Sequence, residues 1–210
     1  MSRIVRWLIA GALGGLVLAG AVLFTAAIAN KDSSGVSAVT ILPQLKSTYE
    51  RTIEQANLPV LLPTEFPELG TEFWLSEYIA NEGNQYTLSV DVESGCEGAG
   101  ACSRGSIGGE IVTADTEPVE AIYSFLNEPL DDPNRPRSDD PMGDVELING
   151  FEGFFVPWIA TAQCSEAKVY WEQPSASGDE LYRYYVGIEC GDRADVVELA
   201  NNVIANTEDF

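Results

Sequence analysis

The stretch "AKVYWEQPSASGDELYRYYVGI", residues 167–188, decides the fold. Apolar and polar side chains alternate along both of its halves, as is typical of strands that bury one face. The segment between the halves contains Pro, Gly and Ser, so the stretch predicts an antiparallel hairpin. Its apolar face takes side chains from both strands: Val169, Trp171, Tyr182, Tyr184, Val186 and Ile188.

Hairpin patterns recur on the N-terminal side of this stretch. "VELINGFEGFFV" (145–156) contains Asn149-Gly150, a pair that favours a type I′ turn between apolar flanks. "EFWLSEYIA" (72–80) and "QYTLSVDVE" (85–93) predict a second hairpin across "NEGN", and "SIGGEIVTA" (106–114) predicts a further strand.

Helical periodicity appears in three places. Residues 43–57 are expected to form an amphipathic helix, 116–128 a short helix, and "RADVVELANNVIAN" (193–206) the closing helix. Together these elements predict an α+β fold, a mostly antiparallel sheet of five to seven strands with the helices packed on one side. The apolar side of the first helix is expected to consist of Leu42, Leu45, Tyr49, Ile53 and Ala56.

The N-terminal segment, residues 1–29, combines Arg3 and Arg6 with an uncharged apolar run from Trp7 to Ala29. About 20 apolar residues span a bilayer as a helix, and flanking basic residues favour a cytoplasmic N-terminus. The alternative is a signal peptide that is cleaved after Ala29. Both interpretations place the bulk of the chain outside the cytoplasm, in a periplasm or lumen or as a secreted protein. They divide the chain into the anchor or signal segment (1–29), a polar linker (30–41) and an extracytoplasmic domain (42–210).

Composition excludes several functions. The chain has 33 acidic and 11 basic residues, a net charge of −22, which disfavours nucleic-acid binding because that requires basic patches. It has no histidine, so it cannot contain a Ser-His-Asp triad or a His-ligated metal site. The membrane is therefore expected as a partner only through the N-terminal helix.

Four cysteines, Cys96, Cys102, Cys164 and Cys190, predict two disulfides in an oxidising compartment. We favour Cys96–Cys102 with Cys164–Cys190, because the first pair is separated by a short small-residue loop and the second flanks the last hairpin. Strict alternation opposes the second pair, since it places Cys190 toward the core and Cys164 away from it. A Cys₄ zinc site is the rival interpretation, although its usual closer spacing is missing.

No motif identifies a reaction. "GACSRGS" (100–106) lacks the lysine of a phosphate-binding loop, and the clustered acids at 91–95 and 139–146 do not have EF-hand spacing. We therefore predict no catalytic, cofactor-binding or metal-ligating residues, and no cofactor is expected. The Tyr and Trp side chains of the predicted strands favour core positions over a sugar-binding or peptide-binding surface.

The C-terminal block resembles a known kind of domain. The motifs are "NGFEGFF", "VYW", "YRYYV" and "LANNVI", which resemble a domain of unknown function in extracytoplasmic proteins, some linked to sporulation and anti-sigma factors. With "LPVLLP" and the Cys96 loop, the arrangement is similar to uncharacterised cyanobacterial membrane-anchored or secreted proteins. The resemblance implies an extracytoplasmic α+β domain and brings no activity with it.

The expected function is therefore a membrane-anchored extracytoplasmic binding or interaction module with an unidentified protein partner. Two alternatives remain open at this point. One is an accessory protein that binds a divalent cation. The other is a hydrolase that depends on paired carboxylates, whose partners meet only in the folded protein.

Overall fold

The predicted hairpins are present in the computed structural model, which describes residues 40–127, 137–160 and 164–207. Strand β6 (Glu166–Pro174) pairs with β7 (Leu181–Glu189), β1 (Trp74–Ala80) with β2 (Gln85–Asp91), and β4 (Gly143–Glu146) with β5 (Glu152–Val156). Between β4 and β5, Asn149 and Gly150 have φ angles of 59° and 77°, as a type I′ turn requires. The turn prediction is confirmed.

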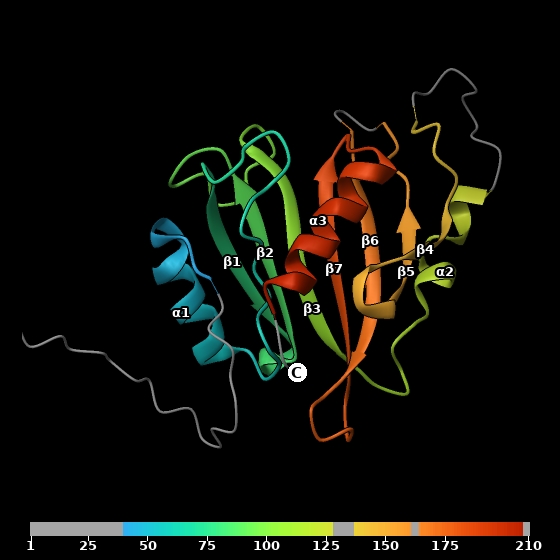
Figure 1. Ribbon diagram of the computed structural model, residues 1–210, viewed down its shortest axis with the longest axis horizontal. Helices are drawn as coiled ribbons and strands as arrows, with labels where there is room; N and C mark the ends of the chain where they lie inside the picture. Colours follow the sequence, from blue (N-terminus) through green and yellow to red (C-terminus); the bar gives the residue numbers. More distant parts are fainter. Residues whose placement is uncertain (1–39, 128–136, 161–163, 208–210) are drawn as a thin grey trace, which may run out of the picture. The chain divides into compact units, whose positions relative to one another are not determined.

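Strand β3 (Ser103–Val112) joins the two halves of the sheet. It pairs with β2 on one side and with β7 on the other, and every strand pair is antiparallel. The resulting seven-stranded sheet has the order β1-β2-β3-β7-β6-β5-β4 (Figure 1). The predicted α+β class with a mostly antiparallel sheet is confirmed.

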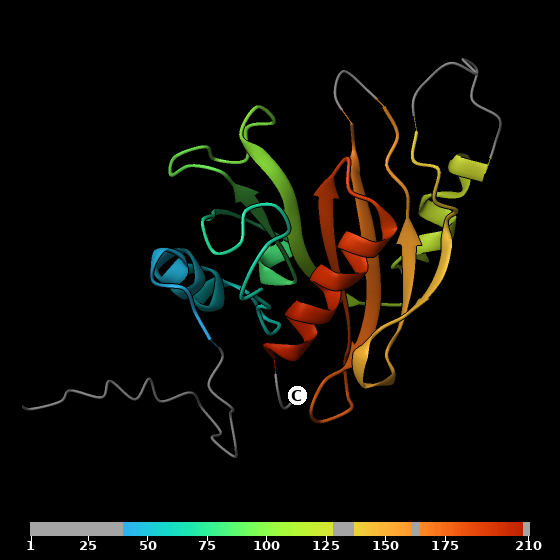
Figure 2. The same ribbon diagram turned by 45° about the horizontal axis from the view of Figure 1, so that its top comes forward.

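One side of this sheet, here the inner face, carries the core. Residues that pair across strands point to the same side, so one buried row runs through Leu88, Ile107, Val186, Val169 and Phe155. Helix α3 (Arg193–Ala205) lies against β7 and β6 on the inner face (Figures 1 and 2). It buries the apolar stripe that its sequence predicts: Val196, Leu199, Ala200, Val203 and Ile204.

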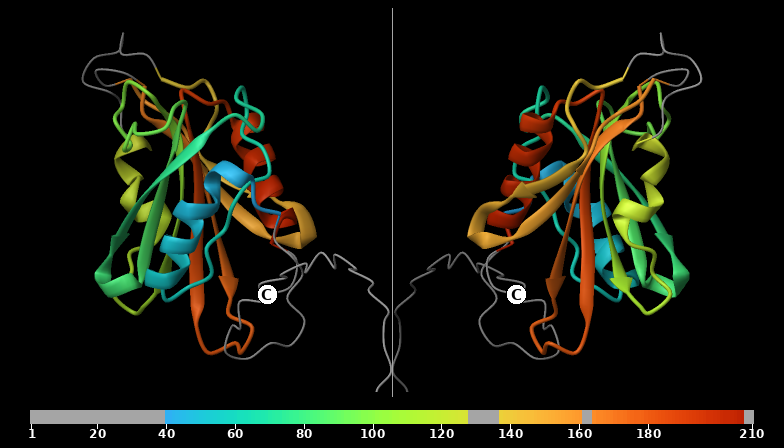
Figure 3. Two further views of the ribbon diagram at one scale, coloured as in Figure 1. Left: turned by 90° about the vertical axis from the view of Figure 1, so that its left-hand side faces the viewer. Right: turned by 90° about the vertical axis from the view of Figure 1, so that its right-hand side faces the viewer.

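The opposite side, here the outer face, is covered over β5 and β6 by the chain between β3 and β4. This connection contains α2 (Val119–Ile122) and a short 3₁₀ turn, η3 (Ser124–Asn127). The hydroxyl of Tyr123, between them, lies 2.7 Å from that of Tyr170 on β6. Figure 3 shows α2 and α3 on opposite sides of the sheet. The prediction that all helices pack on one side is therefore wrong, because the connection must cross from β3 to the far edge strand while α3 fills the inner face.

Helix α1 (Lys46–Gln55) follows a 3₁₀ turn, η1 (Pro43–Leu45), and runs beside the edge strand β1 (Figure 1). The Gln44 amide donates to the carbonyl of Phe73 at 3.4 Å, and the Thr48 hydroxyl donates to that of Leu75 at 3.2 Å. Four helical residues rise about 6 Å, close to the roughly 6.6 Å between alternate strand residues. The helix therefore supplies donors to an edge strand that would otherwise expose free carbonyls.

This role changes which side of α1 is buried. Thr48 and Thr52 are buried, whereas Ile53 is 38% exposed. The predicted apolar side, which included Ile53, is therefore wrong in part. The reason is that the helix meets backbone acceptors at the sheet edge, where hydroxyl groups are more favourable than methyl groups.

The segment predicted to anchor the chain, residues 1–29, and the linker up to residue 39 lie outside the described residues. Within the part of the chain that the structure describes, no helix has the length and apolar character needed to cross a membrane.

Candidate binding site

The disulfides have the predicted pairing. Cys96 is bonded to Cys102 and Cys164 to Cys190, with Cα–Cα distances of 6.0 and 5.2 Å. The obstacle of strict alternation disappears because Cys164 precedes β6 and Cys190 follows β7. Cys190 also has a φ of 53°, which turns its side chain away from the strand pattern. All four cysteines are therefore in disulfides, so none of them is available as a zinc ligand and a Cys₄ zinc site is ruled out in this structure.

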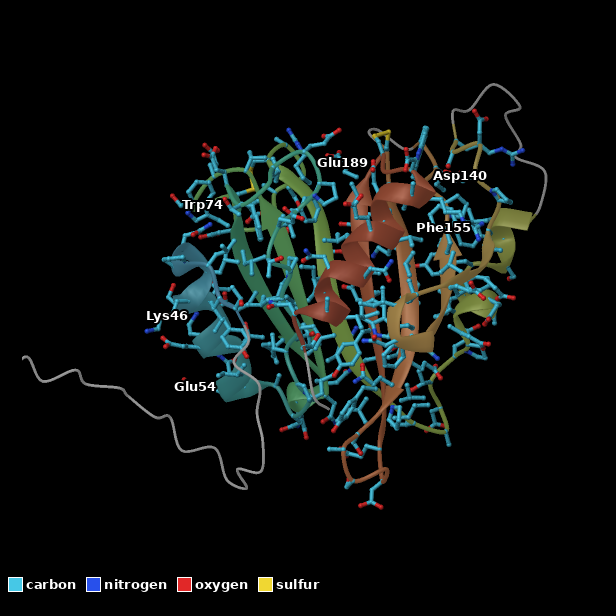
Figure 4. All side chains as sticks on the ribbon, viewed as in Figure 1. Lys46, Glu54, Trp74, Asp140, Phe155 and Glu189 are labelled. Carbon is cyan, nitrogen blue, oxygen red and sulfur yellow. A yellow bond between two sulfur atoms is a disulfide. The ribbon has the colours of Figure 1, made fainter. Side chains whose placement is uncertain are left out.

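Both disulfides brace the same end of the sheet. Asp91 at the end of β2 is opposite Ser103, and Glu166 at the start of β6 is opposite Glu189. A disulfide bond is visible beside Glu189 in Figure 4. This end of the outer face is therefore held by covalent links as well as by strand pairing.

A buried carboxylate fixes the Cys96 loop to the sheet. Asp91 is 1% exposed and accepts hydrogen bonds from the hydroxyls of Ser76 and Ser89. It also accepts one from the backbone N–H of Gly98 in the loop, at 3.4 Å. The small residues around Gly98 allow this close approach, so the glycine-rich loop is a braced connection between β2 and β3.

The aromatic side chains of the strands divide between the two faces. Trp171, Tyr86 and Tyr184 are buried in the core, as the sequence favoured. Tyr170 and Tyr185 lie on the outer face, where their rings are 5.5 Å apart. The prediction of core positions is therefore correct for the first group only, and the outer pair belongs to a polar cluster.

We call this group the Lys168 cluster; it consists of Thr87, Ser106, Glu166, Lys168 and Tyr185 together with Tyr170 and Tyr123. The Lys168 ammonium lies 3.1 Å from Glu166 Oε2 and 4.6 Å from the centre of the Tyr185 ring. Ser106 donates to Glu166 Oε2 at 2.6 Å, and the hydroxyls of Thr87 and Tyr185 are 2.8 Å apart. Four strands, β2, β3, β6 and β7, thus contribute to one network.

Two glycines make room for this network. Gly108 lies opposite Tyr185 in the sheet, and a Cβ atom added there would be 2.3 Å from the Tyr185 ring. Gly187 lies opposite Ser106 and Lys168, and a Cβ atom there would be 2.6 Å from Glu166. The side chains of Tyr185 and Glu166 can therefore lie close to the sheet surface.

The electrostatics of the cluster fix its protonation. Burial acts to lower the pKa of Lys168, but the charge of Glu166, with contributions from Tyr185 and Tyr123, raises it above its ordinary value. Burial also raises the pKa of Tyr170 and of Tyr185. Near neutral pH the cluster therefore presents a charged ammonium beside uncharged phenols.

The outer face also gathers basic side chains. Seven Lys and Arg residues lie in the described part of the chain, and three of them, Arg104, Lys168 and Arg183, come from the central strands of the outer face. Arg104 pairs with Glu189, while Arg183, only 5% exposed, pairs with Glu172 and Glu110. Each of the three basic side chains therefore pairs with at least one carboxylate on the same face.

An apolar cavity of about 270 Å³ adjoins the Lys168 cluster. Glu166 and Lys168 form part of its wall, and the rest comes from Tyr123 and η3, from the end of β5 and the residues after it, and from Ser165. Phe125, 52% exposed, lies at its side. The remaining lining residues are Tyr123, Leu126, Val156, Pro157, Ile159 and Ser165.

Four other hollows in the described part of the chain are larger, and the two largest lack this combination. A groove of about 760 Å³ between α2 and the β4–β5 hairpin is lined by exposed acids, including Glu120, Asp144 and Glu152. The other, about 500 Å³, lies between α3 and the loop at Glu65–Glu68 and contains Asp195, whose pKa is raised by burial and then by neighbouring carboxylates. The described residues contain no cluster of three or more acidic or cysteine side chains suited to a metal ion.

Sequence reasoning missed the Lys168 cluster. Lys168 and Glu166 appear in the sequence as ordinary polar positions of an alternating strand, and Ser106 lies 60 residues away from Glu166. The available signal was Gly108 and Gly187, since glycine inside a strand marks a close approach of another group. No family model, curated protein or solved structure matches this chain.

The buried tyrosines give a prediction for alkaline pH. Burial raises the pKa of Tyr86, Tyr170 and Tyr184 above the ordinary value near 10. The stability that depends on their neutral form is therefore complete below about pH 10 and is lost as the pH rises further. We expect these phenols to ionise only together with unfolding, when ultraviolet absorbance and circular dichroism are followed in one titration. Full tyrosine ionisation before any loss of native dichroism would contradict the prediction.

Proposed function

We propose that the chain is a membrane-anchored, extracytoplasmic binding module whose ligand occupies the cavity beside Lys168. The observation that carries this proposal is the contact between an apolar cavity of about 270 Å³ and a fixed ion pair, Lys168–Glu166. Pockets that bind small molecules are mostly apolar and contain a few polar groups that orient the ligand. The cavity has this composition, and the two largest hollows do not.

Rigidity supports the same proposal. The Cys164–Cys190 disulfide lies next to Ser165 and Glu166, and Ser165 accepts a hydrogen bond from the backbone of Ile159 across the cavity wall. A site that is held in place before binding loses less entropy when a ligand binds. The disulfides therefore support a binding role in addition to stability.

The two alternative functions gain less support. The acids Glu120, Asp144 and Glu152, which line the 760 Å³ groove, are exposed, whereas a hydrolase holds its catalytic carboxyl groups in a cleft that excludes water. Divalent-cation sites usually contain several carboxylates, and the described residues contain no cluster of three or more acidic side chains suited to a metal ion. Neither function is proposed.

The test is to fill the cavity. The full-length protein, purified in detergent with its methyl groups isotopically labelled, is titrated with small isobutyl compounds that carry an alcohol, an acid or an amine. We expect shifts in the methyl resonances of Val156, Ile159 and Leu126, and we expect the Leu126→Trp variant to bind at least about tenfold more weakly because its indole occupies the cavity.

The matched control is Ile122→Trp, which adds the same group at a position that is 42% exposed and does not line the cavity. This control should bind the compounds as tightly as the unmodified protein. Comparing the two tryptophan variants corrects for any partition of the compounds into detergent. If none of the compounds shifts these methyl resonances, or if both tryptophan variants behave alike, the proposed function is wrong.

A further inference from the structure

We propose, building on the proposed function, that the cavity binds a free α-amino acid with an aliphatic side chain. The ligand's carboxylate would pair with Lys168 and its ammonium with Glu166. Its side chain would enter the apolar part of the cavity. Each of these assignments follows from a separate property of the site.

The ion pair selects a zwitterion. The Lys168 ammonium and the Glu166 carboxylate are 3.1 Å apart and project from alternate residues of one strand on the same face. A ligand with only a negative charge approaches Glu166 as well as Lys168, and one with only a positive charge approaches Lys168 as well as Glu166. An α-amino acid places opposite charges on one carbon, so each of its charges can face the opposite charge of the pair.

The contacts around the pair leave room for such a ligand. Among the described residues, Ser106 and Lys168 both bind Oε2 of the Glu166 carboxylate. Its second oxygen can therefore accept from a ligand ammonium. The Lys168 ammonium has three protons, and Glu166 and the Tyr185 ring account for two directions, so a third remains for a carboxylate.

The remaining walls favour a short aliphatic group. Leu126, Val156, Pro157 and Ile159 supply apolar surface opposite the ion pair. The volume of about 270 Å³ lies just below the roughly 300–1,000 Å³ of pockets for drug-sized ligands. A single amino acid is the ligand size that such a volume suggests, and the apolar walls disfavour polar side chains.

The pair is also positioned in advance. Ser106 on β3 holds Glu166, the Tyr185 ring on β7 lies beside Lys168, and Thr87 on β2 holds the Tyr185 hydroxyl. Both ligand-binding groups are thus fixed by strands that the sheet holds rigid. Little rearrangement is needed when the ligand binds.

The experiment is a calorimetric titration of the full-length protein in detergent with a ligand series. L-leucine carries every recognised group, leucinamide lacks the carboxylate, 4-methylpentanoate lacks the ammonium, and glycine lacks the side chain. The dipeptide Leu-Gly keeps both charges but moves them apart. We expect L-leucine to bind most tightly and each of the other compounds to lose at least about tenfold in affinity, since each lacks or misplaces a charge-assisted or apolar contact.

Two variants test the assigned roles. Lys168→Met should remove the preference for leucine over leucinamide, and Glu166→Gln should remove the preference for leucine over 4-methylpentanoate. Lys46→Met is the control, because Lys46 is an exposed residue of α1 that pairs with Glu50 of the same helix and does not line the cavity. It should leave every affinity unchanged.

The outcomes separate this inference from the proposed function. If 4-methylpentanoate, leucinamide or Leu-Gly binds as tightly as leucine, the amino-acid inference is overturned while the cavity remains a binding site. If no compound binds and no cavity methyl resonance shifts, both are overturned. Tightest binding of leucine together with the two expected variant effects supports the inference.

Discussion

Replacing Trp171 by alanine is expected to lower the free energy of unfolding by about 3 to 5 kcal/mol. The indole is 2% exposed and lies on the inner face of β6, with its ring 5.8 Å from that of Tyr184. Alanine removes the apolar contacts of the indole and leaves a cavity on the inner face of the sheet. The indole Nε1 has no hydrogen-bond partner among the described residues, so the loss is one of packing alone.

If Trp171 stabilises the fold by packing alone, Trp171→Phe should be much less destabilising than Trp171→Ala. Phenylalanine keeps most of the ring surface and removes a buried N–H that lacks a protein partner, so its cost is expected to be below about 1.5 kcal/mol. Both variants are compared by thermal and denaturant unfolding, with Tyr78→Ala, at a side chain that is 67% exposed, as the surface control. A Trp171→Phe variant as unstable as Trp171→Ala would show that the N–H does make an essential hydrogen bond.

Removal of the Cys164–Cys190 disulfide, by replacing both cysteines with serine, is expected to cost about 3.5 kcal/mol. The two residues are 26 positions apart, and opening that loop increases the conformational entropy of the unfolded chain. For a domain of this size the midpoint of thermal unfolding should fall by roughly 7 to 14 °C. The same change at Cys96–Cys102, only 6 positions apart, should cost less, about 2.2 kcal/mol.

The comparison of the two double variants is the informative measurement, made by differential scanning calorimetry under non-reducing conditions. The loss is expected to be larger for the longer loop. Because Cys164 precedes the cavity residues Ser165 and Glu166, its removal should also weaken ligand binding, while removal of Cys96 and Cys102 should not. If removal of Cys96–Cys102 proves the more destabilising, the native contacts of the Cys96 loop, such as Gly98 with Asp91, contribute more to stability than the difference in loop entropy.

Local sequence was sufficient for the hairpins and for the division of each strand into two faces. Asn149-Gly150 adopts positive φ angles that few other pairs tolerate, and Trp171 and Tyr184 share the buried side that alternation predicts. These features depend on residues that are close in the chain. For the same reason the pairing of Cys164 with Cys190 could be inferred from the hairpin that they flank.

Features that depend on where a segment packs were predicted less well. The periodicity of residues 43–57 gave the helix but not its buried side, since the edge carbonyls of Phe73 and Leu75 select Gln44 and Thr48. The short helix predicted over 116–128 is limited to α2 and η3 in the structure, and its periodicity gave no indication that this segment covers the outer face. Nothing in a local pattern records which neighbour an element will meet.

By itself the sequence determined the secondary structure, the faces of the strands and the absence of histidine chemistry, because each depends on residue type and local spacing. The tertiary structure alone decided that β3 pairs with β7. That pairing brings Ser106 to Glu166, and the fold places Tyr185 beside Lys168 and closes η3 over an apolar cavity. Such contacts join residues far apart in the chain, and they form only when burial of the whole inner face compensates for the entropy of closing the intervening loops.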